Sequence, residues 1–447
     1  MNSAPVPLSA SENSFGLSEH ELRAPVNTEF LARPPLPLYD ATMVTHLAVV
    51  HEGNHDNEAL LRLAALLERD GWNILASSAA YRLYERGHIL VRCEVHTEFS
   101  SYTLFIPTHL AGQFACATDV LPAEWRSTVA GKLLVAIQIE LRSALDGALE
   151  AKMAELASLS QQMVVSRIVD GNAWVFTDFQ IDAGQSAFLL LDGGLTPRQA
   201  GRTVQRLWEI ETYRVMALLG LPVAQTVARR LRTTEEELAN LTDRIAGSVL
   251  AEDEYAVLAD LTALAAEVEH SMASTAFRFG AARAYAAIVF QRIDELRESR
   301  VAGFPTVREI MDRRFMPPMN TCAAMARRQD DLSGRVARIS QLLRTRIDLA
   351  MKRQNQLVLT QMNQRARQQF RLQETVEGLS VVAITYYGSQ LVHHLALGAS
   401  QFWTQISPEL ATAVAVPVIA VAAIVGIRRL RRRINAEALV AAEIQST

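Results

Sequence analysis

The C-terminal half of the chain contains a stretch whose composition predicts one very long helix. No proline occurs between Pro318 and Pro408, and no glycine occurs from residue 335 to residue 377. Proline and glycine are the residues that most readily interrupt a helix. At a rise of about 1.5 Å per residue, a continuous helix over this stretch is more than about 100 Å long. Such a helix cannot fit inside one globule, so we predict a stalk.

Apolar side chains in this stretch recur at spacings of three and four residues. They are Leu332, Val336, Ile339, Leu343, Ile347 and Ala350. This spacing predicts either a coiled coil, which would make a homo-oligomer through the long helices, or an amphipathic helix that packs on its own neighbours. After Gln361, polar residues cover every face apart from Phe370 and Leu372. That composition is typical of a solvated stalk.

The chain before the long helices has the pattern of a mixed α/β domain. Strand patterns occur at residues 43–51, 88–107, 162–182 and 186–194, and an amphipathic helix is predicted at 57–71. Asp170, Gly171 and Asn172 form a turn signal between two strand-rich runs. At 447 residues, with 49% apolar and 21% charged side chains, the chain is long enough to bury a large core.

A helical period then begins at Thr196, a predicted N-cap followed by Pro197 at the first helical position. Breaks are expected at Pro222, near Gly247, at 301–305 and at Pro317–Pro318. They leave three long helical segments, at 196–246, 252–300 and 320–397. The predicted fold class is therefore α+β, with long helices after the mixed domain.

The sequence predicts five regions along the chain. They are an extended Pro-rich arm (1–41), a cytoplasmic α/β domain (42–194), a long-helix stalk domain (195–376), a two-span transmembrane hairpin (377–427) and a basic cytoplasmic tail (428–447). No secretory signal occurs in the first 30 residues, so we expect the N-terminal domain in the cytoplasm.

The predicted hairpin is based on charge and hydrophobic length. Residues 410–427 carry no charge, and 18 residues lie near the lower limit for crossing a bilayer core, about 17–25. No Lys or Arg occurs between Leu372 and Ile427, whereas both flanks are basic. The flanking arginines are Arg365, Arg367, Arg371, Arg428, Arg429, Arg431, Arg432 and Arg433. The positive-inside rule then places both termini in the cytoplasm of a bacterial inner membrane, with spans near 379–397 and 410–427.

The first predicted span contains polar residues on one half of its helical wheel. These residues are Thr385, Tyr386, Ser389, Gln390, His393 and His394. Polar groups inside a bilayer need partners. We expect this face to lie against the second span or against the same helix of other subunits, while a water-filled path is the alternative.

Composition and motifs point away from several other functions. A formal net charge of −4 gives no general attraction to nucleic acid, and Cys93, Cys116 and Cys322 are too dispersed for a disulfide framework or a zinc site. His46, His51 and His55 lie in a polar segment, which we interpret as solvated residues at a strand end. The GxSxG and P-loop motifs are absent. We therefore expect no enzyme activity, no cofactor and no metal.

Several segments also resemble an uncharacterised bacterial family of membrane-anchored proteins. They are "ELRAPVNTEFLARPPLPL", "NAWVFTDFQID", "GGLTPRQAGRTVQRLWEIETYRVMALLGLPVA" and "TVEGLSVVAITYY". The resemblance covers residues 17 to 435 and implies a membrane anchor without known chemistry. The order of parts is also similar to that of the CorA magnesium transporters. The Gly-Met-Asn signature of those proteins is absent, and the nearest string is Tyr387–Gln390, "YGSQ".

These features predict a membrane-anchored, cytoplasm-facing scaffold or interaction protein, whose protein partners the sequence does not name. The lipid bilayer and a second copy of the chain are the expected partners. A divalent-cation channel or transporter with CorA-like architecture is the alternative. Clustered carboxylates in the outer loop would favour transport, and the predicted loop offers Glu409.

Overall fold

The computed structural model describes the chain except residues 1–18, 32–33, 52–55, 79, 130, 145–161, 248–250, 401–407 and 446–447. The side chains at 25, 29, 31, 56–59, 251–252, 399–400, 408 and 430–445 are also not described. The chain divides into two compact units. One comprises Met1–Gly247 and Ala256–Ser340, and the other comprises Ser248–Tyr255 and Gln341–Thr447.

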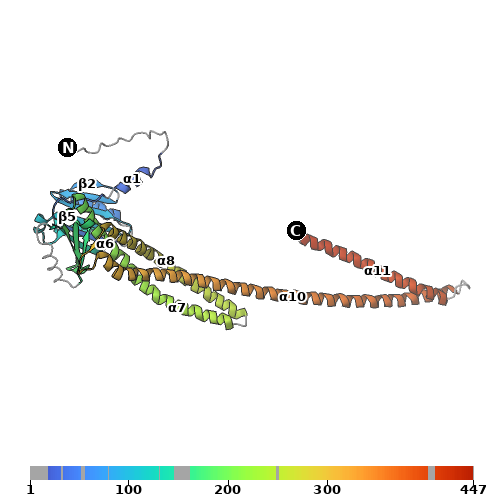
Figure 1. Cartoon of the computed structure of the whole chain (residues 1–447). Helices are drawn as coiled ribbons and strands as arrows, with labels where there is room; N and C mark the ends of the chain where they lie inside the picture. The colour runs from blue at the N-terminus through green and yellow to red at the C-terminus, as the bar shows by residue number, and fades with distance from the viewer. Residues whose placement is uncertain are drawn as a thin grey trace. The chain divides into compact units, whose positions relative to one another are not determined.

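The first unit is built on one large, mostly antiparallel sheet (Figure 1). Its strands are β1 (Thr42–Val50), β2 (Asn73–Ser77), β3 (Tyr81–Arg86), β4 (Ile89–Val95), β5 (Phe99–Pro107), β6 (Lys132–Ser143), β7 (Val164–Ile168), β8 (Ala173–Thr177), β9 (Ile181–Asp182), β10 (Gln185–Asp192) and β11 (Ser299–Arg300). The order across the sheet is β11-β7-β8-β10-β6-β1-β5-β4-β3-β2, with β9 paired to β10. The α+β class predicted from the sequence is confirmed.

The helices are α1 (Arg23–Leu31), α2 (Asp56–Arg69), α3 (Thr108–Ala111), α4 (Trp125–Thr128), α6 (Pro197–Leu218), α7 (Gly220–Gly247), α8 (Ala251–Leu296), α9 (Val307–Ile310), α10 (Met316–Ser400) and α11 (Pro408–Gln445). Helix α1 lies within the predicted extended arm. Pro25 is tolerated there because it falls in the first helical turn, where its missing N–H is not needed.

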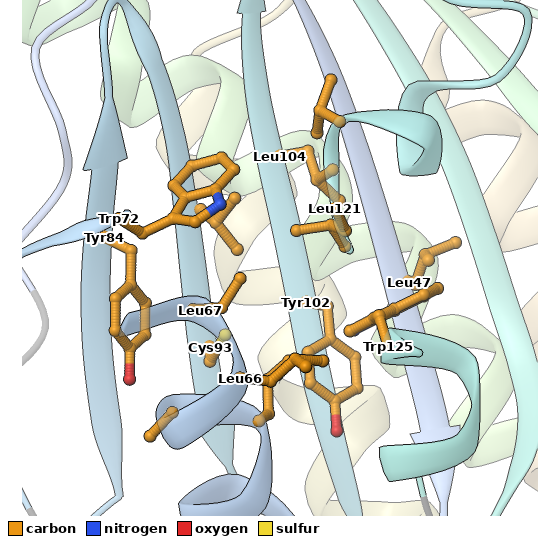
Figure 2. Packing of buried hydrophobic residues seen from close by; sticks show 14 of the residues in the cluster. Leu47, Leu66, Leu67, Trp72, Tyr84, Cys93, Tyr102, Leu104, Leu121 and Trp125 are labelled. Atoms are coloured by element: carbon orange, nitrogen blue, oxygen red, sulfur yellow. The ribbon is translucent and has the colours of Figure 1, made fainter. Parts of the chain in front are cut away.

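An apolar core covers one face of the central strands (Figure 2). Successive side chains of β5 point to opposite faces, so Tyr102, Leu104 and Ile106 share this face. Leu63 and Leu67 of the amphipathic helix α2 pack against it and are almost fully buried. Burying a Leu side chain contributes about 1.5–3 kcal/mol, which makes this cluster a main source of stability.

Helix α6 begins where the sequence predicts. Thr196 is its N-cap, and its hydroxyl oxygen accepts a hydrogen bond from the backbone N–H of Gln199. In turn Gln199 Oε1 accepts from the backbone N–H of Thr196 at 2.9 Å. This reciprocal capping box satisfies two of the otherwise unpaired N–H groups at the helix start. Helix boundaries lie close to the predicted breaks at Pro222 and Pro317–Pro318, since α6 ends at Leu218, α7 begins at Gly220 and α10 begins at Met316. These prolines lie in the first turns of α7 and α10, so the helices start there.

The long helices of the first unit are joined by polar contacts around an apolar seam. Arg328 of α10 forms an ion pair with Glu235 of α7, and the Gln329 amide donates to the Ser271 hydroxyl of α8 at 3.1 Å. Leu332 and Val336 are buried at 1% exposure. The start of the predicted seam is therefore covered by other helices of the same chain.

A close backbone approach fixes the segment before the sheet against α6. Leu38 donates its N–H to the carbonyl of Pro197 at 3.0 Å. A Cβ atom at Gly201 would lie 1.7 Å from the carbonyl oxygen of Leu36. Only glycine fits this position of the helix.

We expect Gly201→Ala to destabilise the protein by about 1–3 kcal/mol, because the added methyl group collides with backbone. Gly280→Ala on α8 is the matched control, since Gly280 has open space around it. Alanine there should stabilise by about 0.5–1 kcal/mol through helix propensity. Thermal unfolding should show a lower melting temperature for Gly201→Ala and a higher one for Gly280→Ala. Equal changes in the two variants would contradict the close approach of Gly201 to Leu36.

Candidate functional site

The second face of the central strands carries a row of polar side chains. His46 on β1 lies opposite Thr103 on β5, and Thr103 lies opposite Arg92 on β4. Ser101 and Glu94 form the next pair along the same two strands. Because strand residues two apart share a face, these side chains all point away from the apolar core.

Helix α6 covers this face with side chains spaced three and four residues apart. Gln205, Trp208, Glu209, Thr212 and Tyr213 therefore occupy one side of the helix. Together with the strands and α8 they line a partly open pocket of about 260 Å³. We call it the polar chamber, and it is lined by His46, Arg92, Glu94, His96, Phe99, Ser101, Gln205, Trp208, Glu209, Thr212, Tyr213 and Arg292.

A buried ion pair lies in the floor of the chamber. Arg92 Nη2 donates to Glu94 Oε1 at 2.8 Å, and the side chains are only 2% and 6% exposed. Such a pair loses much of its hydration when it is buried, so its attraction roughly offsets that penalty. Removing one partner would leave an uncompensated buried charge. The arrangement therefore holds both residues in place without being a large net source of stability.

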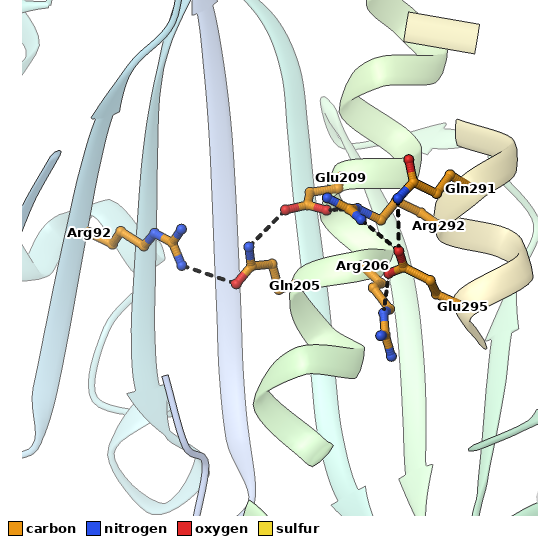
Figure 3. A network of polar contacts seen from close by, with 7 residues as sticks. All are labelled: Arg92, Gln205, Arg206, Glu209, Gln291, Arg292 and Glu295. Atoms are coloured by element: carbon orange, nitrogen blue, oxygen red, sulfur yellow. Dashed lines mark hydrogen bonds and ion pairs between the residues drawn. The ribbon is translucent and has the colours of Figure 1, made fainter. Parts of the chain in front are cut away.

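Polar contacts continue from this pair across α6 to α8 (Figure 3). Arg92 Nη1 donates to Gln205 Oε1 at 3.3 Å, and Gln205 Nε2 donates to Glu209 Oε1 at 2.8 Å. Arg292 of α8 forms an ion pair with Glu209 and a second one, at 2.9 Å, with Glu295. The network links the sheet to two helices through hydrogen bonds of the neutral Gln205 and ion pairs of Arg292.

His46 is held neutral in the chamber wall. Its ring stacks on Trp208 with centroids 5.4 Å apart, and Nδ1 lies 2.8 Å from Thr103 Oγ1. Burial lowers the pKa of His46 to about 3, with smaller contributions from His96 and Arg92. The interpretation of this histidine as a solvated strand-end residue is wrong, because its side chain is 2% exposed.

The predicted membrane region lies in the second unit. Within the described residues, one helical segment is long and apolar enough to cross a bilayer: Glu409–Arg429 of α11, 21 residues with none of its apolar window buried. This is weak evidence of membrane association. Residues 379–397 belong to α10 and do not reach the same apolar character, because polar side chains interrupt them. This finding does not support the prediction of two spans or the predicted orientation of the termini.

Helices α10 and α11 contact each other along the polar stretch. His393 Nδ1 lies 3.1 Å from Thr412 Oγ1, and a Cβ atom at Gly388 would lie 3.1 Å from the Ile419 side chain. The hydroxyl groups of Thr385 and Ser389 donate to carbonyls of their own helix, those of Val381 and Tyr386. The remaining predicted polar-face residues, Tyr386, Gln390 and His394, are exposed.

The flanking arginines of the sequence prediction are solvent-facing where they are described. Arg365, Arg367 and Arg371 are exposed on α10, and Arg428 and Arg429 are exposed on α11. The side chains of Arg431, Arg432 and Arg433 lie outside the described residues. Within the described part of the chain, no group of three or more His, Cys, Asp or Glu side chains is placed to hold a metal ion.

The structure thus defines an α+β protein with long helices and one helix apolar enough to cross a membrane. Residues 18–434 match the family model described as a protein of unknown function (DUF3422), and the chain belongs to that family. No curated protein matches the sequence. The family is uncharacterised, and the similarity to CorA transporters is not supported by these comparisons.

The sequence interpretation did not identify the polar chamber. The one sign of the chamber in the sequence is a set of polar side chains on a strand that lies inside the sheet. In "ILVRCEVH", Arg92, Glu94 and His96 alternate with apolar residues, although β4 lies inside the sheet. Alternation alone is equally typical of a strand with one solvated face. Only the position of α6 over that face shows that it is enclosed.

The pKa of His46 predicts a specific dependence of stability on pH. In the unfolded chain His46 binds a proton below about pH 6.5, whereas the folded protein resists protonation until about pH 3. Protonation therefore favours unfolding, and the stabilisation present above pH 6.5 is lost as the pH falls towards 3. At pH 5 the loss from this residue is about 2 kcal/mol.

We expect His46→Asn to remove the pH-dependent part of the free energy of unfolding that His46 contributes, while keeping a polar group near Thr103. The difference in melting temperature between wild type and variant should then narrow as the pH falls from 7 to 5. Thermal unfolding across this pH range measures it. A constant difference would mean that His46 has the same pKa in the folded and the unfolded protein.

Proposed function

We propose that the protein is a membrane-anchored scaffold or interaction protein whose α+β unit faces the cytoplasm. The observation that carries the proposal is the segment Glu409–Arg429, whose large apolar side chains Val414, Val418 and Val421 are at least 60% exposed. A protein in water rarely exposes such a continuous apolar surface. A bilayer covers it, and the arginines that follow favour the cytoplasmic side.

The contacts between α10 and α11 support a hairpin rather than a lone anchor. Because Gly388 lies against Ile419 and His393 against Thr412, residues 379–397 run beside the apolar segment. If α11 crosses the bilayer, residues 379–397 of α10 lie at the same depth in it. The polar groups Thr385 and Ser389 bond to their own backbone there, which reduces the penalty of placing them in lipid.

Self-association through α10 is part of the proposal. The stalk between residues 348 and 377 is almost entirely exposed and carries exposed Leu357, Met362 and Phe370. A second copy of the chain would cover these side chains. The protein partners of the scaffold are not defined by these features.

Charged residues in α11 should release the protein from the membrane. Each Asp near the middle of a span adds about 2.5–3.5 kcal/mol to insertion, so Val418→Asp with Val421→Asp adds roughly 5–7 kcal/mol. The matched control is Leu357→Asp with Leu359→Asp, on the exposed stalk. Alkaline extraction of membranes, followed by immunoblotting, should find only the α11 variant in the soluble fraction. Retention of both variants would show that α11 is not the anchor.

The hairpin can be separated from a single span by cysteine labelling. After replacement of Cys93, Cys116 and Cys322 by serine, Thr404→Cys and Thr447→Cys are each introduced. A membrane-impermeant maleimide added to intact cells should label position 404 and leave position 447 unlabelled until the cells are lysed. Labelling at 447 with protection at 404 would establish one crossing with an external C-terminus.

Cation transport is the competing hypothesis, and it is tested by flux. Purified protein in liposomes that contain a magnesium-sensitive dye should give no signal above protein-free liposomes. Clear flux that is blocked by Ser389→Leu would overturn the scaffold proposal, because Ser389 lies on the half-buried face of α10. Leu357→Ser on the stalk serves as the control for nonspecific effects of substitution.

A further inference from the structure

The polar chamber contains more hydrogen-bonding groups than its own residues satisfy. Arg92 Nε, Ser101 Oγ, Thr212 Oγ1 and His46 Nε2 are buried and make no hydrogen bond with the described part of the protein. Their residues are 2% exposed or less, and all four line the same cavity. A buried polar group left without a partner costs about 1–3 kcal/mol. Four such groups around one space indicate that something polar occupies it.

The size of the chamber limits the occupant. Its volume of about 260 Å³ lies just below the range of about 300–1,000 Å³ that is usual for small-molecule sites. The occupant is therefore about as large as one amino acid, or it is a cluster of roughly eight waters at about 30 Å³ each. The aromatic side chains of Phe99, Trp208 and Tyr213 form part of the wall. An organic side chain can pack against this part of the wall, while the polar remainder offers hydrogen bonds.

The charges of the chamber select the class of ligand. Its lining carries two arginines, Arg92 and Arg292, and two glutamates, Glu94 and Glu209. Two histidines complete the titratable groups: His46, which is neutral, and His96. A simple anion or cation would bring an unbalanced charge into this space, which is unfavourable at low dielectric. An uncharged apolar molecule would leave the unpaired groups unsatisfied. A zwitterion brings both charges and no net charge.

We propose that the polar chamber binds a free α-amino acid or a zwitterion of similar size. The carboxylate lies near Arg92 Nε and the hydroxyls of Ser101 and Thr212, which supply donors that the protein leaves unused. The ammonium group lies near the carboxylates of Glu94 and Glu209. The aromatic wall contacts the ligand side chain. This site is independent of the membrane anchor and holds whether or not α11 crosses a bilayer.

The test uses the full chain purified in detergent. Thermal unfolding is recorded with each of the protein amino acids at millimolar concentration, and with succinate and putrescine as a dianion and a dication of similar size. We expect at least one amino acid to raise the melting temperature by about 3 °C or more, and neither charged probe to do so. Isothermal titration calorimetry then gives the Kd for the amino acid that binds.

Two variants place the binding in the chamber. Ser101→Ala and Thr212→Val each remove an unpaired hydroxyl and keep the Arg92–Glu94 pair, so both should fold and weaken binding about tenfold or more. Thr203→Val is the matched control on α6, because Thr203 Oγ1 is also buried and unpaired but does not line the chamber. Its Kd should stay within about twofold of wild type.

Four results would overturn the proposal. These are no response to any amino acid, stabilisation by succinate or putrescine instead, an unchanged Kd in both chamber variants, and an equal loss in Thr203→Val. If Ser101→Ala and Thr212→Val raise the melting temperature while no amino acid binds, the chamber is a hydrated structural cavity only.

Discussion

The architecture of the first unit depends on covering both faces of its central strands. Strand β5 is buried along almost its whole length, with Tyr102, Leu104 and Ile106 towards α2. On the face towards α6, Ser101 and Thr103 alternate with Phe99 and Phe105. The apolar face is stabilised by removal of its surface from water. The face towards α6 also buries apolar side chains, among them Phe105 and Trp208, and specific polar contacts fix the rest of its cover. The hydrogen bonds and ion pairs from Arg92 through Gln205 to Glu295 provide them, and the Gly201 contact holds the segment before β1 against the same helix.

The sequence predicts well those parts of the fold that depend on local patterns. The strands at 43–51 and 88–107, the helix at 57–71 and the Thr196 N-cap all depend on local patterns, and all are confirmed. The helix boundaries near Pro222 and Pro317–Pro318 lie one or two residues before the prolines, because a proline fits the first turn of a helix. Strand β6 was not predicted, although "KLLVAIQIELRS" is long and β-rich, because only its partners β1 and β10 establish it as central.

The polar chamber could not be predicted for a related reason. Its residues come from β1, β4, β5, α6 and α8, and more than 240 positions separate His46 from Arg292 along the chain. Nothing local distinguishes a polar strand face that meets water from one that meets a polar helix. The consequence is visible at His46, whose sequence context indicates exposure while its burial lowers the pKa to about 3. Tertiary contact, rather than residue type, decides its chemistry.

The polar residues of α10 also leave open, in the sequence, whether they face water or protein. Here two of them are satisfied within their own helix. Thr385 and Ser389 return their hydroxyl hydrogen bonds to carbonyls three or four residues earlier, so the helix satisfies these groups by itself. A histidine cannot do this in a helix, and His393 instead lies beside Thr412 of α11. One inter-helix polar contact beside a close Gly388–Ile419 approach resembles the way small residues and isolated hydrogen bonds join helices in lipid. Polar content therefore does not by itself exclude residues 379–397 from a membrane, because Thr385 and Ser389 need no partner outside their own helix and His393 has one on α11.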